Sequence, residues 1–109
     1  MTHGITNHSH PQELLRLKKI IQSIHGILRT WIAHSYDHLG FSQAVAVAKA
    51  EELCELVSPF CPAHANLVQL LNALKRLPND PSACLKAAHE LETVSRYFDL
   101  DRYLLTRRA

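Results

Sequence analysis

The chain has little glycine, few aromatic residues and no long apolar run. Its 109 residues include three glycines, and aromatic residues make up 6%. No apolar stretch approaches the roughly 18 residues that a membrane-spanning helix needs, and the first ten residues have neither the basic nor the apolar segment of a secretory signal. We therefore expect a protein that does not cross a membrane and that resides in the cytoplasm.

The chain also has few cysteines and a small net charge. Cys54, Cys61 and Cys84 form an odd set without the spacing of a disulfide framework, which favours a reducing compartment. The formal net charge of +2 is too small to indicate a nucleic-acid partner, and the aromatic residues are too dispersed to predict a stacking surface for single strands. We expect no nucleic acid among the partners.

The sequence does have many good helix formers and a hydrophobic content of 47%, which is ordinary for one globular domain. Residues 1–8 are polar and show no periodicity. We expect them to form a mobile tail ahead of a single helical-bundle domain over residues 9–109.

Apolar residues at helical spacing predict four helices. The first is predicted from about Pro11 to Tyr36, because one apolar stripe follows a 3,4 spacing there: Leu14, Leu17, Ile21, Ile24, Leu28 and Trp31. Further helices are predicted over 42–58, 62–77 and about 81–105, separated by turns at Gly40, Pro59 and 78–81. The fold class is therefore all-α, an up-down four-helix bundle with long first and last helices and two shorter central helices. Gly26, inside the first helix, indicates either a close helix crossing or a tolerated glycine.

The predicted helix lengths carry a further expectation. At 1.5 Å per residue, the first and last helices would reach roughly 35–40 Å and the central pair only about 24 Å. The excess length falls at one end of the bundle, where two helices alone cannot bury their apolar residues. The predicted interface residues at that end are Leu14, Leu17, Ile21, Phe98 and Leu104. We therefore expect a homodimer through this end, or a protein partner there, and a non-catalytic interaction or regulatory module.

The segment Cys61-Pro62-Ala63-His64 is the sharpest local candidate for chemistry. A cysteine at a helix N-terminus with a histidine nearby is in surroundings that stabilise a thiolate. The segment resembles one arm of the thioredoxin-type C-P-x-C motif, although His64 replaces the second cysteine and no βαβ pattern surrounds it. It leaves open an alternative function, a metal- or thiol-responsive binding protein that uses histidines and Cys61.

Eight histidines also suggest metal binding. His34 and His38, four residues apart, would present their rings on one face of a helix, as zinc-binding helices require. Zinc needs three or four ligands, however, and Thr93 stands where the His89-Glu90 segment would need its second histidine. The sequence therefore predicts no metal site and no cofactor.

Arg29 and His34 match the R-x4–6-H pattern. In this pattern and in size, the chain resembles the small helical HEPN-type ribonucleases, whose arginine and histidine act on the RNA phosphodiester. In that family the pair lies late in the bundle, whereas here it lies in the first predicted helix. The resemblance leaves a HEPN-like ribonuclease as a second alternative, and we assign no catalytic residue.

Overall fold

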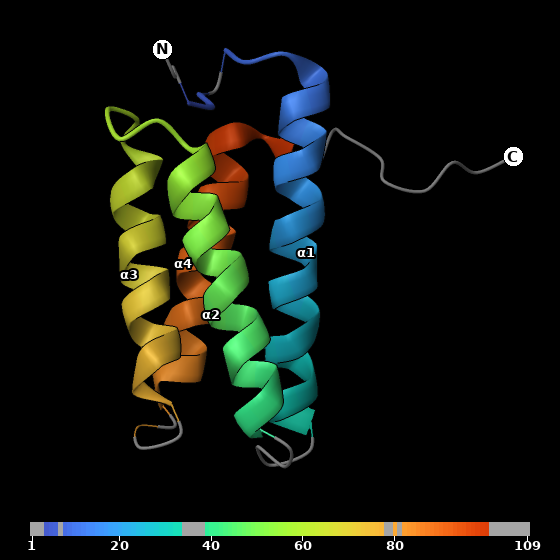
Figure 1. Ribbon diagram of the computed structural model, residues 1–109, viewed down its shortest axis with the longest axis vertical. Helices are drawn as coiled ribbons and strands as arrows, with labels where there is room; N and C mark the ends of the chain where they lie inside the picture. The colour runs from blue at the N-terminus through green and yellow to red at the C-terminus, as the bar shows by residue number, and fades with distance from the viewer. Residues whose placement is uncertain (1–3, 7, 34–38, 78–79, 81, 101–109) are drawn as a thin grey trace, which may run out of the picture.

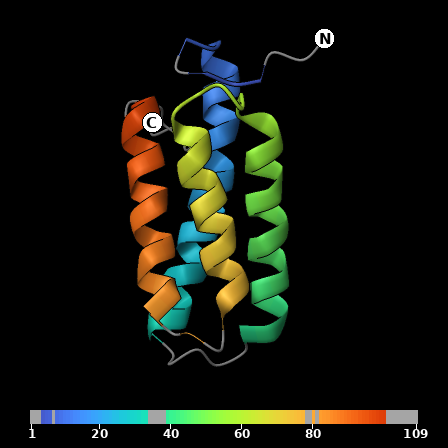
Figure 2. The same ribbon diagram turned by 90° about the vertical axis from the view of Figure 1, so that its left-hand side faces the viewer.

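The computed structural model describes residues 4–6, 8–33, 39–77, 80 and 82–100, and these form four α-helices. The helices are α1 (Pro11–Ala33), α2 (Leu39–Leu56), α3 (Ala63–Arg76) and α4 (Ser82–Phe98). Consecutive helices run in opposite directions, and each packs against two neighbours, so that α1 and α3 both contact α2 and α4 (Figure 1 and Figure 2). The predicted up-down four-helix bundle is confirmed. Within the described ranges, no helix is long and apolar enough to cross a membrane.

The start of α1 follows its sequence signals. The ring Nδ1 of His10 accepts a hydrogen bond from the backbone N–H of Gln12 at 3.3 Å, so His10 caps the helix. Pro11 takes the first helical position, where its missing N–H costs nothing. The apolar stripe that follows is buried as predicted, with each of its six members at most 4% exposed: Leu14, Leu17, Ile21, Ile24, Leu28 and Trp31.

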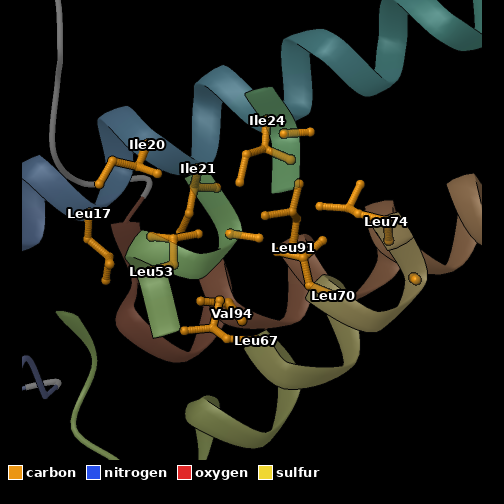
Figure 3. Packing of buried hydrophobic residues seen from close by; sticks show 14 of the residues in the cluster. Leu17, Ile20, Ile21, Ile24, Leu53, Leu67, Leu70, Leu74, Leu91 and Val94 are labelled. Atoms are coloured by element: carbon orange, nitrogen blue, oxygen red, sulfur yellow. The ribbon is translucent and has the colours of Figure 1, made fainter. Parts of the chain in front are cut away.

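One apolar core runs between the four helices. Figure 3 shows side chains from every helix meeting there, among them Ile24 of α1, Leu53 of α2, Leu70 of α3 and Leu91 of α4. The buried face of α2 is rich in small residues, since both Ala46 and Ala50 are fully buried. The sequence predicts that such small side chains let this helix approach a neighbour closely.

Two helix boundaries differ from the prediction. The second helix begins at Leu39, so Gly40 lies in its first turn and is not the cap that ends the first helix. The last helix ends at Phe98 instead of continuing to about residue 105, because Asp99 adopts a left-handed φ of 54°. Aspartate reaches this conformation more readily than most residues. Residues 101–109, including Leu104, lie outside the described residues.

The first residues do not all lie outside the bundle, in contrast to the expected tail over 1–8. Residues 4–6, which we call the N-terminal strap, pack against the end of α2. Ile5 is only 4% exposed, and it forms a parallel bridge with Val57. The physical reason is that Ile5 adds a large apolar side chain to the core, which outweighs the polarity of its neighbours.

Candidate functional site

Four of the five residues predicted to form a dimer interface are described, and all four are buried within the single chain. Leu14, Leu17, Ile21 and Phe98 are all at most 4% exposed, and Leu17 is fully buried. They belong to the core cluster, where Figure 3 shows Leu17 and Ile21 on the inner side of α1. The reason for assigning them to an interface, that the chain cannot cover them, therefore does not hold.

The chain covers this end of the bundle with its own segments. The last helix is shorter than predicted, with 17 residues against the 23 of α1, so less of it projects beyond the central helices. Ile5 of the strap, Val57 and Cys61 of the α2–α3 turn and Leu100 after α4 are all buried in the same core. All three segments lie at the same end of the bundle (Figure 1).

The most exposed large apolar side chain in the described residues also lies at this end. Phe60, in the turn between α2 and α3, is 94% exposed. Hydrogen bonds fix the turn around it: the N–H of Phe60 donates to Ser58 Oγ at 3.3 Å, and the N–H of Cys61 donates to the Ser58 carbonyl at 3.0 Å. Pro59 and Pro62 flank this segment. The turn therefore holds an aromatic ring in solvent on a restrained backbone.

The strap is attached to this same turn by backbone hydrogen bonds. The N–H of Ile5 donates to the Leu56 carbonyl at 2.6 Å, and the N–H of Ser58 donates to the Ile5 carbonyl at 3.0 Å. Gly4 has a φ of 72°, and a Cβ at this position would lie 2.5 Å from Ser58 Cα. The strap thus contacts Ser58, the residue that also bonds the Phe60 amide.

Cys61 is buried and is not presented to solvent. It is 7% exposed, and its thiol interacts with the hydroxyl of Tyr97 on α4. Hydrogen bonding to Cys61 is the main cause that raises the pKa of Tyr97, followed by desolvation and the charge interaction with Cys61. The electrostatic interaction therefore places Cys61 of the α2–α3 turn near Tyr97 at the end of α4.

The histidine of the Cys61–His64 segment is engaged elsewhere. The ring Nε2 of His64 lies 3.1 Å from the backbone carbonyl of Cys54, near the end of α2.

Burial raises the pKa of the Cys54 thiol, and the charges of Glu51 and Glu55 raise it further, while Lys75 lowers it. Cys54 is therefore held in its neutral form at neutral pH, which disfavours thiolate chemistry.

One carboxylate in the described part of the chain is buried, that of Glu90 on α4. It accepts a hydrogen bond from Asn66 Nδ2 of α3 at 2.8 Å and pairs with Lys86 Nζ at 3.3 Å. Because both oxygens of Glu90 are engaged, the group fixes the packing of α3 on α4.

The remaining sequence candidates are the metal-binding histidines and the Arg29–His34 pattern. No three histidine, cysteine or acidic side chains in the described ranges form a group that could hold a metal. His34 and His38 lie outside the described residues, so the structure does not test the pair. Arg29 of the ribonuclease pattern is exposed on α1, and its partner His34 is outside the described part of the chain.

No family of known proteins matches this chain, and no curated protein or solved structure matches it. What the fold and the site define is therefore a class, a four-helix bundle with an apolar ring displayed on one turn.

Sequence reasoning misses the two residues that define this end of the molecule. The prolines beside Phe60 mark only a helix boundary, and Ile5 falls within the segment expected to be a polar tail. A signal is present in both cases, because each is a large apolar residue within a polar or turn-forming segment. Such an isolated residue has no periodicity, so the pattern does not say whether it is buried or exposed.

Proposed function

We propose that this protein is a non-catalytic protein–protein interaction module that acts as a homodimer. The observation that carries the proposal is the 94% exposure of Phe60 on the α2–α3 turn. Burying a phenylalanine side chain is worth about 1.5–3 kcal/mol, and aromatic residues are enriched at the centres of interfaces. An exposed ring of this kind is a natural anchor for association.

The backbone around Phe60 supports the same proposal. The ring stands between Pro59 and Pro62, and its amide is bonded to Ser58. Because the turn is already ordered, association loses less conformational entropy than it would with a flexible loop.

The non-catalytic part of the proposal is supported by the way the candidate reactive groups are used. Cys61 interacts with Tyr97, His64 bonds a backbone carbonyl and Glu90 is held by two partners. Each of these contacts stabilises the bundle. None of them leaves the group poised for a substrate.

Sedimentation velocity over a range of protein concentrations tests the proposal. We expect the wild-type chain to dimerise and Phe60→Ser to weaken dimerisation by about tenfold or more, the change expected for losing an anchor worth about 1.4 kcal/mol or more. Leu85→Ser is the matched control, because Leu85 is also exposed, at 65%, but lies at the start of α4 at the other end of the bundle. Dimerisation that is insensitive to Phe60→Ser, or a chain that stays monomeric, would contradict the proposal.

A further inference from the structure

The N-terminal strap occupies a site made by residues at the end of α2 and in the α2–α3 turn. The Leu56 carbonyl is at the last residue of α2, where helical carbonyls have no partner within the helix. The strap satisfies this carbonyl with the N–H of Ile5 and returns its own carbonyl to the N–H of Ser58. The end of α2 is therefore a docking site for a short extended segment, of the kind that adds a strand by backbone hydrogen bonds.

The side chains of the strap residues show which sequences the site at the end of α2 can bind. Ile5 fills the apolar part of the site and is 4% exposed. Gly4 is required directly before it, because its φ of 72° and the 2.5 Å approach of a Cβ to Ser58 Cα both exclude a side chain. A glycine followed by a large apolar residue is thus the sequence that this site accepts.

The described residues that connect the strap to α1 are joined by hydrogen bonds within one local turn. The N–H of Thr6 donates to Ser9 Oγ at 2.8 Å, and the N–H of Ser9 donates to the Thr6 carbonyl at 3.0 Å. The N–H of His8 also donates to Thr6 Oγ1 at 3.2 Å. Among the described residues of this connection, all three are local bonds within four residues of the chain.

We propose that two copies of the chain exchange their straps, so that Ile5 of each copy docks at the α2 end of the other. The proposal rests on the proposed function, that copies associate through this end. The partner's strap fits because it has the same sequence and remakes the same two backbone bonds, which is the usual basis of segment exchange. Since the strap site and Phe60 share the α2–α3 turn, an exchanged dimer brings the two exposed rings toward one interface.

The first test measures docking between separate molecules. A labelled synthetic peptide with the sequence of residues 2–9 is titrated by fluorescence anisotropy into the full-length Ile5→Asp chain, whose own strap is released. We expect the peptide to bind, and a peptide carrying Gly4→Ala to bind about tenfold more weakly or worse, since its Cβ meets the Ser58 backbone. Absence of binding to a chain whose circular dichroism remains helical would overturn the proposal.

The second test uses the unmodified chain. Isotopically labelled and unlabelled copies are mixed at a concentration where they sediment as a dimer, and nuclear Overhauser effects are recorded only between labelled and unlabelled molecules. We expect such an effect between the side chains of Ile5 and Val57, because their backbones form a parallel bridge and both residues are buried in the core. A dimer that shows no such effect between molecules would overturn strap exchange and leave the proposed function intact. A monomer would overturn both.

Discussion

At the scale of single residues, two glycines have opposite structural roles. Gly26 lies in the middle of α1, and a Cβ there would meet nothing within 4 Å. Gly4 has a φ of 72° and lies directly against the Ser58 backbone. Glycine in a helix interior is less favourable than alanine, whereas glycine at a positive φ is favoured over every residue with a side chain.

We predict that Gly26→Ala raises the free energy of unfolding by about 0.5–1 kcal/mol, because it adds helix propensity and introduces no clash. The measurement is urea denaturation followed by the fluorescence of Trp31, which is the single tryptophan and is buried. Gly4→Ala is the control and should lower the free energy of unfolding by about 1–3 kcal/mol, because it is strained in the strap. If both substitutions shifted stability in the same direction, the roles assigned to the two glycines would be wrong.

The apolar stripe of α1 could be predicted residue by residue, because helical periodicity fixes which side chains share a face. What covers that face could not be predicted. Leu14 and Leu17 belong to a core that is completed by segments without periodicity, namely the strap and the α2–α3 turn. Phe60 and Cys61 illustrate the same difficulty, since they are neighbours in one turn and one is exposed while the other is buried.

At the scale of helices, the start of α4 depends on Asp80. Its carbonyl accepts a hydrogen bond from the N–H of Ala83 at 2.9 Å, as expected for a residue that precedes a helix. Its carboxylate accepts a hydrogen bond from Ser82 Oγ at 2.6 Å and pairs with Arg76 Nε at 3.4 Å. The bond from Ser82 is the main cause that lowers the pKa of Asp80, and Arg76 lowers it as well.

This lowered pKa predicts a pH dependence of stability. Because the pKa of Asp80 is lower in the folded chain than in the unfolded chain, its contribution is complete above the unfolded value of about 4 and is lost as the pH falls through the folded value. Wild type should therefore unfold at a higher urea concentration than Asp80→Asn at neutral pH. The difference should disappear at low pH.

Ser82→Ala provides a control for this prediction, because it removes the main cause of the shift. The effect of Asp80→Asn is measured a second time in the Ser82→Ala background, where it should depend less on pH than in the wild-type background. High salt should also reduce the pH dependence, since the carboxylate is exposed and its pairing with Arg76 is screened. A difference between wild type and Asp80→Asn that stays constant from neutral to acidic pH would contradict the assignment.

Apolar spacing and turn residues were enough to predict the number, order and direction of the helices. The residues at which the helices begin and end were predicted less accurately. α2 begins before Gly40 and α4 ends at Phe98, because glycine is compatible with a first turn and Asp99 takes a left-handed φ. At such positions the local sequence permits the helix either to continue or to end, and tertiary packing decides which occurs.

At the scale of the whole molecule, the end of the bundle that carries the strap contains both buried core residues and an exposed aromatic ring. The core there includes Leu17, Val57 and Leu100, drawn from three segments far apart in the sequence. The α2–α3 turn covers this core on one side and holds Phe60 in solvent on the other. At this end of the bundle, the buried residues therefore stabilise the fold, and the proposed association uses the exposed Phe60.

This division predicts that Leu17 stabilises the fold of one chain and does not contribute to a dimer contact. Leu17 is fully buried, so Leu17→Ala should lower the free energy of unfolding by about 2–5 kcal/mol through lost burial and the cavity left behind. Urea denaturation of both chains over about a hundredfold range of protein concentration provides the measurement. Any dimer formed through Phe60 would stabilise both chains equally as concentration rises, so the difference between them should stay constant.

Leu85→Ala completes this comparison as an exposed leucine, and it should change the free energy of unfolding by no more than about 0.5 kcal/mol. If Leu17 instead lay between two copies, wild type would gain stability with concentration and Leu17→Ala would not, so their difference would widen. A widening difference would restore the interface first expected from the sequence. If the difference between wild type and Leu17→Ala stays constant, the surface through which copies would meet remains the α2–α3 turn, with Phe60 and the strap beside it.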